Sequence, residues 1–237
     1  MSRGKVDYKI YSSRDEPKEL YKQAASLMRI FEDENIDKKK LIDIGGANGS
    51  FCGFIRSKNK NISLTNSEYN QKILKKHKIF FEKNKINVKV DDANLLTEKD
   101  DSYDYVTSFG VTQIFDDFIP SFSEMIRITK PGGIICNSII VNEKDIDVII
   151  KYLDPDSKKQ ISGWNKFSIK SISDFLKNNP KVLEYNFHKH EMPFDIDPKP
   201  DLLRSYTKNI DGKRIIWNDG LNMEITTYLI IIKKKFN

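Results

Sequence analysis

Cysteine is scarce in this sequence, and so is the chemistry that depends on it. The 237 residues contain two cysteines, Cys52 and Cys136, which lie far apart, form no CxxC pair and have no histidine at zinc-site spacing. This pattern favours neither a disulfide framework nor a metal site. We therefore expect no bound metal, and we expect both cysteines to lie in the core.

Long apolar runs are also missing. The longest, residues 229–232, is followed by three lysines, whereas a membrane-spanning helix needs about 20 apolar residues. The N-terminal residues 1–5 lead into charged sequence instead of the apolar core of a signal peptide, and no glycine- or serine-rich linker divides the chain. We expect a soluble, cytoplasmic protein without a membrane span and with one domain over residues 1–237.

The charge balance is basic. The chain has 40 lysines and arginines against 34 acidic residues, a net charge of +6 and a pI near 9.0. Such a surplus suits an anionic partner, either nucleic acid or a phosphate-bearing substrate. It equally suits a lysine-rich solvated surface in a chain that is also rich in Asn and Ile. We favour the solvated surface, so nucleic acid is a possible partner but not the favoured one.

Apolar segments alternate with amphipathic helical segments along most of the chain. Strands are expected at residues 41–44, 62–65, 88–90, 103–108, 133–140, 182–188 and 224–232. Helices are expected at residues 17–35, after residue 49, at 67–83 with Ser67 as the cap, and at 116–129, whereas 144–180 has a helical and irregular pattern. This alternation predicts a mostly parallel, doubly wound α/β sheet.

The turn after the first strand is the most informative segment. Ligands of open α/β sheets bind beyond the carboxyl ends of the strands, and glycines allow the backbone to turn sharply and approach a ligand closely. Here Asp43 stands two positions before the glycine-rich segment Gly45–Gly49. The segment does not match the G-x-G-x-x-G pattern of dinucleotide sites. A carboxylate at this place suits a ligand with a cationic amino group, although a tight strand-to-helix connection alone would also use glycine.

Three segments in order resemble the class I S-adenosylmethionine-dependent methyltransferases, over about residues 41–133. The turn resembles that family's first motif, with Ala47 where a third glycine often stands. Asp92-Ala93-Asn94 resembles its third motif, and residues 127–133 resemble its Arg-x-Leu-Lys-Pro-Gly-Gly turn. The resemblance implies a Rossmann-like, doubly wound, mostly parallel seven-stranded sheet with helices on both faces and the last strand antiparallel. It also implies S-adenosylmethionine as the cofactor.

The second strand departs from the family pattern. Family members usually end this strand with Asp or Glu, whose oxygens accept hydrogen bonds from the ribose hydroxyls, but here Thr65 or Asn66 stands at that place. The segment resembles the Thr-Leu-Ser variant of the cyclopropane fatty acid synthase branch, in which a Gln assists from a position near that of Asn70. We expect a neutral ribose clamp. Glu68 is the rival, although at a helix start it would also interact favourably with the helix dipole.

The resemblance implies a cofactor-binding half at about residues 36–140 and an acceptor-binding region with the final strands at about 141–237. It places Asp92 to Asn94 against the adenine, and Ser108 and Phe109 at the border between cofactor and acceptor. The full set of expected cofactor contacts is Asp43, Gly45, Gly46, Ala47, Asn48, Gly49, Thr65, Asn66, Ser67, Asn70, Asp92, Ala93, Asn94, Ser108 and Phe109.

The acceptor is less clearly marked. No Asn-Pro-Pro-Tyr or Asp-Pro-Pro-Tyr motif follows the fourth strand, which disfavours methylation of amino groups by the route that this motif supports. The leading hypothesis is a small polar acceptor, with or without phosphate, methylated at an oxygen of a sugar, nucleotide-linked intermediate or related metabolite. RNA methylation and a non-catalytic cofactor-binding partner protein are the alternatives. His188 and His190 are the candidate bases, because they point the same way on an expected strand; they could equally be plain strand residues.

Overall fold

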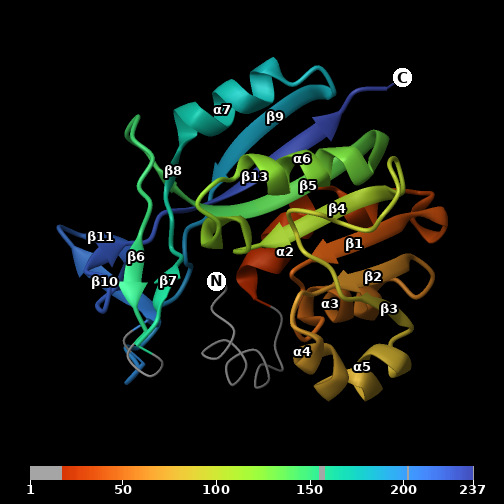
Figure 1. The fold of residues 1–237 in the computed structure, drawn as a ribbon. Helices are drawn as coiled ribbons and strands as arrows, with labels where there is room; N and C mark the ends of the chain where they lie inside the picture. The colour runs from red at the N-terminus through yellow and green to blue at the C-terminus, as the bar shows by residue number, and fades with distance from the viewer. Residues whose placement is uncertain (1–17, 155–157, 202, 237) are drawn as a thin grey trace.

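The central sheet has seven strands in the order β3-β2-β1-β4-β5-β13-β9 (Figure 1), and an eighth short strand, β8 Phe167–Ser168, pairs with the end of β5. The computed structural model describes residues 18–154, 158–201 and 203–236. The neighbouring strands from β3 to β5 are parallel, whereas β13 is antiparallel to both β5 and β9. The predicted fold is confirmed, including the antiparallel last strand. The strands are β1 Lys40–Ile44, β2 Ser63–Ser67, β3 Ile86–Lys89, β4 Tyr103–Phe109, β5 Thr129–Asn142, β9 Val182–Lys189 and β13 Thr227–Lys234.

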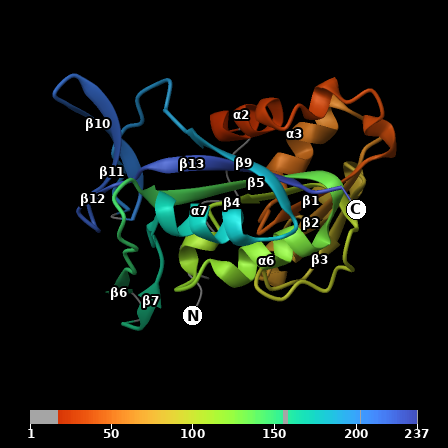
Figure 2. The same cartoon turned by 90° about the horizontal axis from the view of Figure 1, so that it is seen from above.

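Helices cover both faces of this sheet (Figure 2). Side chains alternate along each strand, so that Leu41 joins one core cluster and Ile42 the other. Helices α2 and α3 pack on the first face together with α4 and α5, and α6 and α7 pack on the second. Both cysteines are buried and free, as expected. The helices are α2 Glu19–Leu27, α3 Ser50–Lys58, α4 Gln71–Lys76, α5 Lys78–Lys83, α6 Ile119–Ile128 and α7 Ile169–Asn178.

The long helix predicted over residues 67–83 is wrong. Strand β2 continues through Ser67, and the segment then forms two short helices that meet at His77, whose backbone is not helical. The cap of α4 is Asn70, whose side chain accepts a hydrogen bond from Lys72 N at 3.0 Å. Parallel pairing with β1 and β3 carries β2 beyond its last apolar residue, and the apolar pattern alone does not report this pairing.

The first helix is also shorter than predicted. It ends at Leu27, and Arg29 then adopts a left-handed conformation with φ of 53° before two short 3-10 turns, Ile30–Glu32 and Ile36–Lys38. The expected start of this helix, residue 17, lies outside the described residues. Within the described residues, no helix is long and apolar enough to span a membrane.

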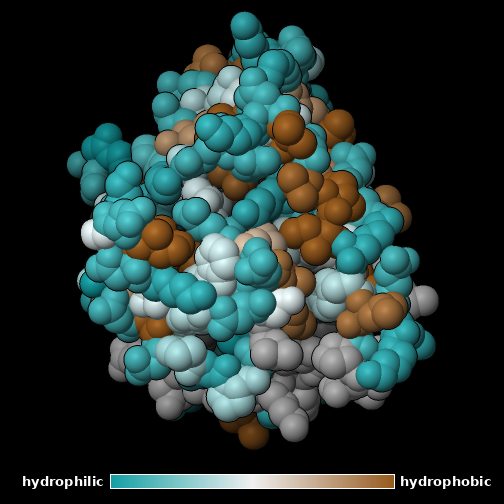
Figure 3. Space-filling model, turned by 90° about the vertical axis from the view of Figure 1, so that its left-hand side faces the viewer, coloured by the Kyte–Doolittle hydropathy of each residue, from teal (hydrophilic) through white to brown (hydrophobic). Residues whose placement is uncertain are grey.

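Two small sheets project from one end of the main sheet (Figure 1). The segment expected to be helical and irregular contains the hairpin of β6 Lys151–Leu153 and β7 Gln160–Ser162, the short strand β8 Phe167–Ser168 and then α7. A three-stranded antiparallel sheet follows β9 and comprises β10 Ser205–Ile210, β11 Lys213–Asn218 and β12 Met223–Glu224. The face that carries these sheets is mostly hydrophilic, with hydrophobic side chains in separate groups (Figure 3).

Candidate functional site

A cavity of about 700 Å³ lies at the carboxyl ends of β1, β2 and β4. Strands end here in the turns and loops where open α/β sheets bind ligands. Its described lining residues all lie between Lys18 and Phe115, and the described residues of the region expected to bind the acceptor contribute none. The lining residues are Lys18, Tyr21, Asp43, Gly45, Gly46, Ala47, Asn48, Ser50, Glu68, Tyr69, Asn70, Gln71, Lys72, Ile73, Asp91, Asp92, Ala93, Phe109, Gly110, Val111, Ile114 and Phe115.

The glycine-rich turn forms one wall of the cavity. Gly45 has a φ of +67°, and a Cβ there would overlap the side chain of Val111, which also lines the cavity. A Cβ on Gly46 would overlap Asn66 Oδ1 and approach Asp43 Oδ2 at 2.7 Å. Both positions therefore require glycine because the turn lies close to its neighbours.

Two further positions of the turn have positive φ. Ala47, where the family often has glycine, lines the cavity with a φ of 47°. Gly49 has a φ of +78° and does not line the cavity; a Cβ there would overlap the ring of Phe81. Gly49 therefore allows α3 to pack against α5, which is a role in the fold.

Asp43 is a buried carboxyl group in the cavity wall. Its side chain is 1% exposed, and Thr107 Oγ1 donates a hydrogen bond to its Oδ1 at 2.8 Å. Burial raises the pKa of Asp43 to about 7, and the nearby charge of Glu68 also raises it. The Thr107 hydrogen bond and the charge of Lys18 lower this pKa, but by less. A cationic group that enters the cavity beside Asp43 would favour the ionised carboxylate.

The end of β2 presents Glu68 to the cavity. Thr65, Asn66 and Ser67 are buried and do not line it. Glu68 accepts hydrogen bonds from two backbone N–H groups, from Ala47 at 3.2 Å and from Asn70 at 2.8 Å. The segment around Glu68 is therefore fixed against the glycine-rich turn, and Glu68 lies three residues before the first residue of α4 instead of inside a helix.

Strand register explains why Glu68 takes this place. Ser67 pairs with Ile44, the last residue of β1, and Gly46 N donates to Ser67 O at 3.0 Å. The next residue after Ser67 consequently emerges beside the glycine-rich turn. The sequence signal for Glu68 was its acidic character, but the register of β2 against β1 is a tertiary property.

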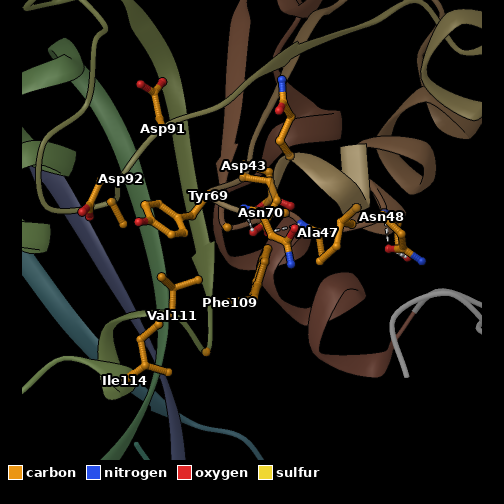
Figure 4. A pocket seen from close by; sticks show the side chains of 18 of the residues that line it. Asp43, Ala47, Asn48, Tyr69, Asn70, Asp91, Asp92, Phe109, Val111 and Ile114 are labelled. Carbon is orange, nitrogen blue, oxygen red and sulfur yellow. Dashed lines mark hydrogen bonds between the residues drawn. The ribbon is translucent and has the colours of Figure 1, made fainter. Parts of the chain in front are cut away.

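Tyr69, Asp91 and Asp92 form the other end of the cavity (Figure 4). Tyr69 is 65% exposed, so one part of its ring is accessible from outside. Asp91 is buried, accepts a hydrogen bond from Thr97 N at 3.2 Å, and keeps Oδ2 without a hydrogen-bond partner among the described residues. A buried carboxylate oxygen of this kind requires a donor, and a ligand in the cavity can supply one.

The loop after β4 supplies an apolar wall. Phe109 packs against Tyr21 and Phe51, with ring centroids 4.9 and 4.8 Å apart. Phe115 also lines the cavity, and its carbonyl accepts a hydrogen bond from Asn165 Nδ2 at 2.6 Å. Asn165 is fully buried, so the region after β5 contacts the cavity wall from behind without lining it.

Both candidate bases, His188 and His190, lie outside the cavity lining. His188 belongs to β9 and pairs with Leu229. His190 is buried, and its Nδ1 lies 2.7 Å from Gln23 Oε1 on α2. Burial lowers the pKa of His190, with Glu19 opposing the change. The ring of His190 therefore joins the segment that follows β9 to α2, and burial favours its neutral form.

The expected cofactor residues divide into two groups. Nine line the cavity: Asp43, Gly45, Gly46, Ala47, Asn48, Asn70, Asp92, Ala93 and Phe109. Six lie outside its lining: Gly49, Thr65, Asn66, Ser67, Asn94 and Ser108. Lining residues that the sequence did not indicate include Lys18 and Tyr21, which precede the first strand and carry no local signal of a site. Within the described residues, no group of three or more His, Cys, Asp or Glu side chains is placed to hold a metal ion.

Comparison with known proteins agrees with this architecture. A family model described as a methyltransferase domain matches residues 16–179. The fold is similar to that of the YcgJ protein from Bacillus subtilis, with a TM-score of 0.61 and 14% identity over 91% of this chain and 99% of that one. It is also similar to a SAM-dependent methyltransferase from Methanosarcina mazei, with a TM-score of 0.57 and 14% identity over 84% and 93% of the two chains.

A third similar structure is a Haloferax volcanii methyltransferase in complex with the Trm112 methyltransferase activator, with a TM-score of 0.56 and 14% identity over 96% of this chain and 97% of that one. No curated protein sequence matches the chain.

The chain belongs to the methyltransferase domain family, since the family model covers more than half of its length. It is a class I methyltransferase that uses S-adenosylmethionine, as the glycine-rich turn and the two later motifs predicted. The narrower likeness of the ribose-side motif to the cyclopropane fatty acid synthase branch is not confirmed by these comparisons.

Proposed function

We propose that the cavity binds S-adenosylmethionine and that the enzyme transfers its methyl group to a small polar acceptor, with or without phosphate. When bound, the cofactor supplies an electrophilic methyl group on a sulfonium, which passes to a nucleophile by in-line displacement. The observation that carries this proposal is the joining of the glycine-rich turn, Asp43 and Glu68 in one wall of the cavity. These residues fit the amino-acid and ribose ends of the cofactor.

The polar groups around the cavity support the fit. Asp43 faces the cavity next to Gly45 and Gly46, where a cationic amino group would ionise it. Glu68 has two carboxylate oxygens beside the turn, which suit two hydroxyl donors. The unpartnered Oδ2 of Asp91 suits an amino donor. We assign the adenine to the end with Tyr69, Asp91, Asp92 and Ala93.

The proposal changes the expected ribose clamp. Thr65, Asn66 and Ser67 are buried behind the cavity wall, so we assign ribose binding to Glu68 with help from Asn70. Gly49, Asn94 and Ser108 receive supporting roles for the same reason, because they do not line the cavity. The other nine expected residues keep their proposed contact with the cofactor.

The acceptor side is proposed at Val111, Ile114 and Phe115, on the loop that follows β4. Asn165 holds this loop through Phe115 O at 2.6 Å and through its own N–H to Gln113 O at 3.0 Å. Residues 36–140 would thus form the cofactor half, and residues 141–237 would shape the acceptor side indirectly. Because methyl transfer can proceed through proximity and orientation without a base, and neither His188 nor His190 lines the cavity, we assign the histidines no catalytic role.

Calorimetric titration with S-adenosylhomocysteine, with NAD as the control ligand, tests the cofactor site. Micromolar binding of S-adenosylhomocysteine alone is the expected result, and binding of NAD alone would overturn the site. Incubation with methyl-labelled S-adenosylmethionine and a cell extract separated into small molecules and RNA tests the acceptor. Label in the small-molecule fraction supports the proposal, whereas label in RNA alone would establish the alternative acceptor.

A further inference from the structure

The positive charge of the chain is concentrated in one segment. Residues 50–87 contain nine lysines and arginines and two acidic residues, a net charge of +7, whereas the whole chain has a net charge of +6. The remaining 199 residues therefore carry a net charge of −1. A lysine-rich habit of the whole sequence does not explain this segregation, because acidic residues balance the lysines and arginines in the sum over the other 199 residues.

The helices of this segment lie on one side of the central sheet. The segment comprises α3, β2, α4 and α5, and α3 packs against α5, since a Cβ on Gly49 or Gly53 would overlap the rings of Phe80 and Phe81. Arg56 on α3 joins the ends of these elements through hydrogen bonds to the carbonyls of Lys60, Asn84 and Lys85. We call the exposed surface of α3, α4 and α5, together with the turns that follow α3 and α5, the cationic face.

Six of the eight lysines of the cationic face have no carboxylate partner among the described residues. Glu82 is the exposed acidic residue on these helices, and it pairs with Lys78 at 3.6 Å. Within the described part of the chain, six exposed lysines have no carboxylate within ion-pair distance: Lys58, Lys60, Lys72, Lys75, Lys83 and Lys85. Elsewhere on the molecule, lysines such as Lys130, Lys189 and Lys208 each pair with an aspartate or glutamate.

The cationic face leads into the cavity. Lys72, on the first turn of α4, lies on the face and also lines the cavity. Tyr69 stands just before α4 with its ring 65% exposed at the cavity wall. Exposed cations beside an accessible aromatic ring are the combination that binds a single-stranded nucleic acid, with phosphates on the lysines and an unpaired base on the ring.

We propose that the cationic face binds the phosphate backbone of a single-stranded nucleic acid, with Tyr69 as the stacking platform at the cavity mouth. An anionic membrane fits less well, because Ile79 is the one large hydrophobic side chain exposed on α4 and α5, and surface helices of membranes need an apolar face. The proposal goes beyond the methyl-transfer function and holds whether the acceptor is a small molecule or part of the bound strand.

Fluorescence anisotropy with a labelled single-stranded RNA of about 20 nucleotides tests the proposal, because site sizes on such surfaces reach about 16 nucleotides. The test variant is Lys75→Glu with Lys83→Glu, which lie outside the cavity lining. The control is Lys177→Glu with Lys213→Glu, two exposed lysines that lack an ion pair within the described residues and lie on α7 and β11. Both variants change the net charge equally.

We expect the test variant to lose at least about tenfold in RNA affinity at low salt, while the control keeps the affinity of the native protein. Each phosphate contact to a single strand contributes about 0.7 to the slope of log affinity against log salt, so the test variant should lose about 1.4 from that slope. Equal losses in both variants, tighter binding of a duplex than of the single strand, or binding of phosphatidylserine vesicles without RNA would overturn the proposal.

A second variant tests the stacking platform, and a second ligand separates the cationic face from the cofactor site. Tyr69→Ala should weaken RNA binding by about five- to a hundredfold, the range for one stacked base. Unchanged RNA affinity would contradict the role of Tyr69 as the stacking platform. Calorimetric titration of the Lys75→Glu/Lys83→Glu variant with S-adenosylhomocysteine should give native affinity. If this variant loses RNA binding but keeps native cofactor affinity, the cationic face binds RNA independently of the cofactor site.

Discussion

At the scale of single residues, the ionisation of Asp43 links cofactor binding to pH. Burial holds its pKa at about 7, above the ordinary value of 3.8. Between these pH values the folded protein keeps a proton on Asp43 that the unfolded chain has lost, so the free energy of unfolding decreases as pH rises through this range. A cationic amino group bound beside Asp43 lowers the pKa of this carboxyl group, because it stabilises the ionised carboxylate.

We therefore expect the affinity for S-adenosylhomocysteine to rise by up to about tenfold per pH unit from about pH 5 to pH 7 and then to level off. Asp43→Asn should remove this dependence and weaken binding at pH 7.5 by about 1.5–3 kcal/mol, the range for a hydrogen bond to a charged group. Calorimetric titration across the pH range measures both effects. A variant that retains the pH dependence of the native protein would show that another group titrates.

Glu68 provides a second test at the residue scale, because it distinguishes an acidic ribose clamp from the neutral one. Glu68→Gln keeps the shape of the side chain but removes its charge, and we expect it to weaken S-adenosylhomocysteine binding by about 1.5 kcal/mol or more. Glu82→Gln is the matched control, since Glu82 is exposed on α5 away from the cavity. Native affinity in the Glu68→Gln variant would contradict the acidic ribose clamp and favour the neutral clamp expected at Thr65 and Asn66.

At the scale of elements, the glycine-rich turn combines backbone strain with close packing. Gly45→Val forces a side chain into a left-handed backbone and against Val111. We expect no measurable binding of S-adenosylhomocysteine, with a near-native far-UV circular dichroism spectrum. Gly212→Val is the control, because Gly212 has a φ of +77° in the β10–β11 turn and a Cβ there meets nothing within 4 Å.

The control variant should lose about 1–2 kcal/mol of stability from the backbone conformation alone and should keep cofactor binding. Thermal unfolding of both variants measures this shared cost. If both bind S-adenosylhomocysteine equally well, the turn serves the fold and does not form the cofactor site.

At the scale of the whole molecule, the last strand completes the fold from inside the sheet. Strand β13 lies between β5 and β9, and Lys234 at its end is 5% exposed. The Lys234 ammonium donates to Asp101 Oδ1 at 2.5 Å, Thr129 O at 2.6 Å and Arg127 O at 3.3 Å. These contacts connect the end of the chain to the loop before β4 and to the start of β5.

Lys234→Met should therefore lower the free energy of unfolding by about 2–3 kcal/mol, because it leaves buried carbonyl groups without a donor. Urea unfolding measures this change, and Lys235→Met, at an exposed position, is the control. The cavity lies at the other ends of the strands, so binding of S-adenosylhomocysteine to the folded variant should be native. A loss below about 0.5 kcal/mol would mean that water replaces the ammonium.

The sequence by itself determined the α/β class, the positions of most strands of the central sheet along the chain, the glycine-rich turn and the family. These properties depend on local patterns, namely the alternation of apolar residues, turn chemistry and the spacing of Asp43 from Gly45. Only the tertiary structure decided that Glu68 reaches the cavity, since the pairing of Ser67 with Ile44 sets which residue emerges beside the turn. It also placed His188 and His190 outside the cavity lining and packed α3 against α5 through Gly53 and Phe80, because strand register and helix packing depend on contacts that local sequence patterns do not report.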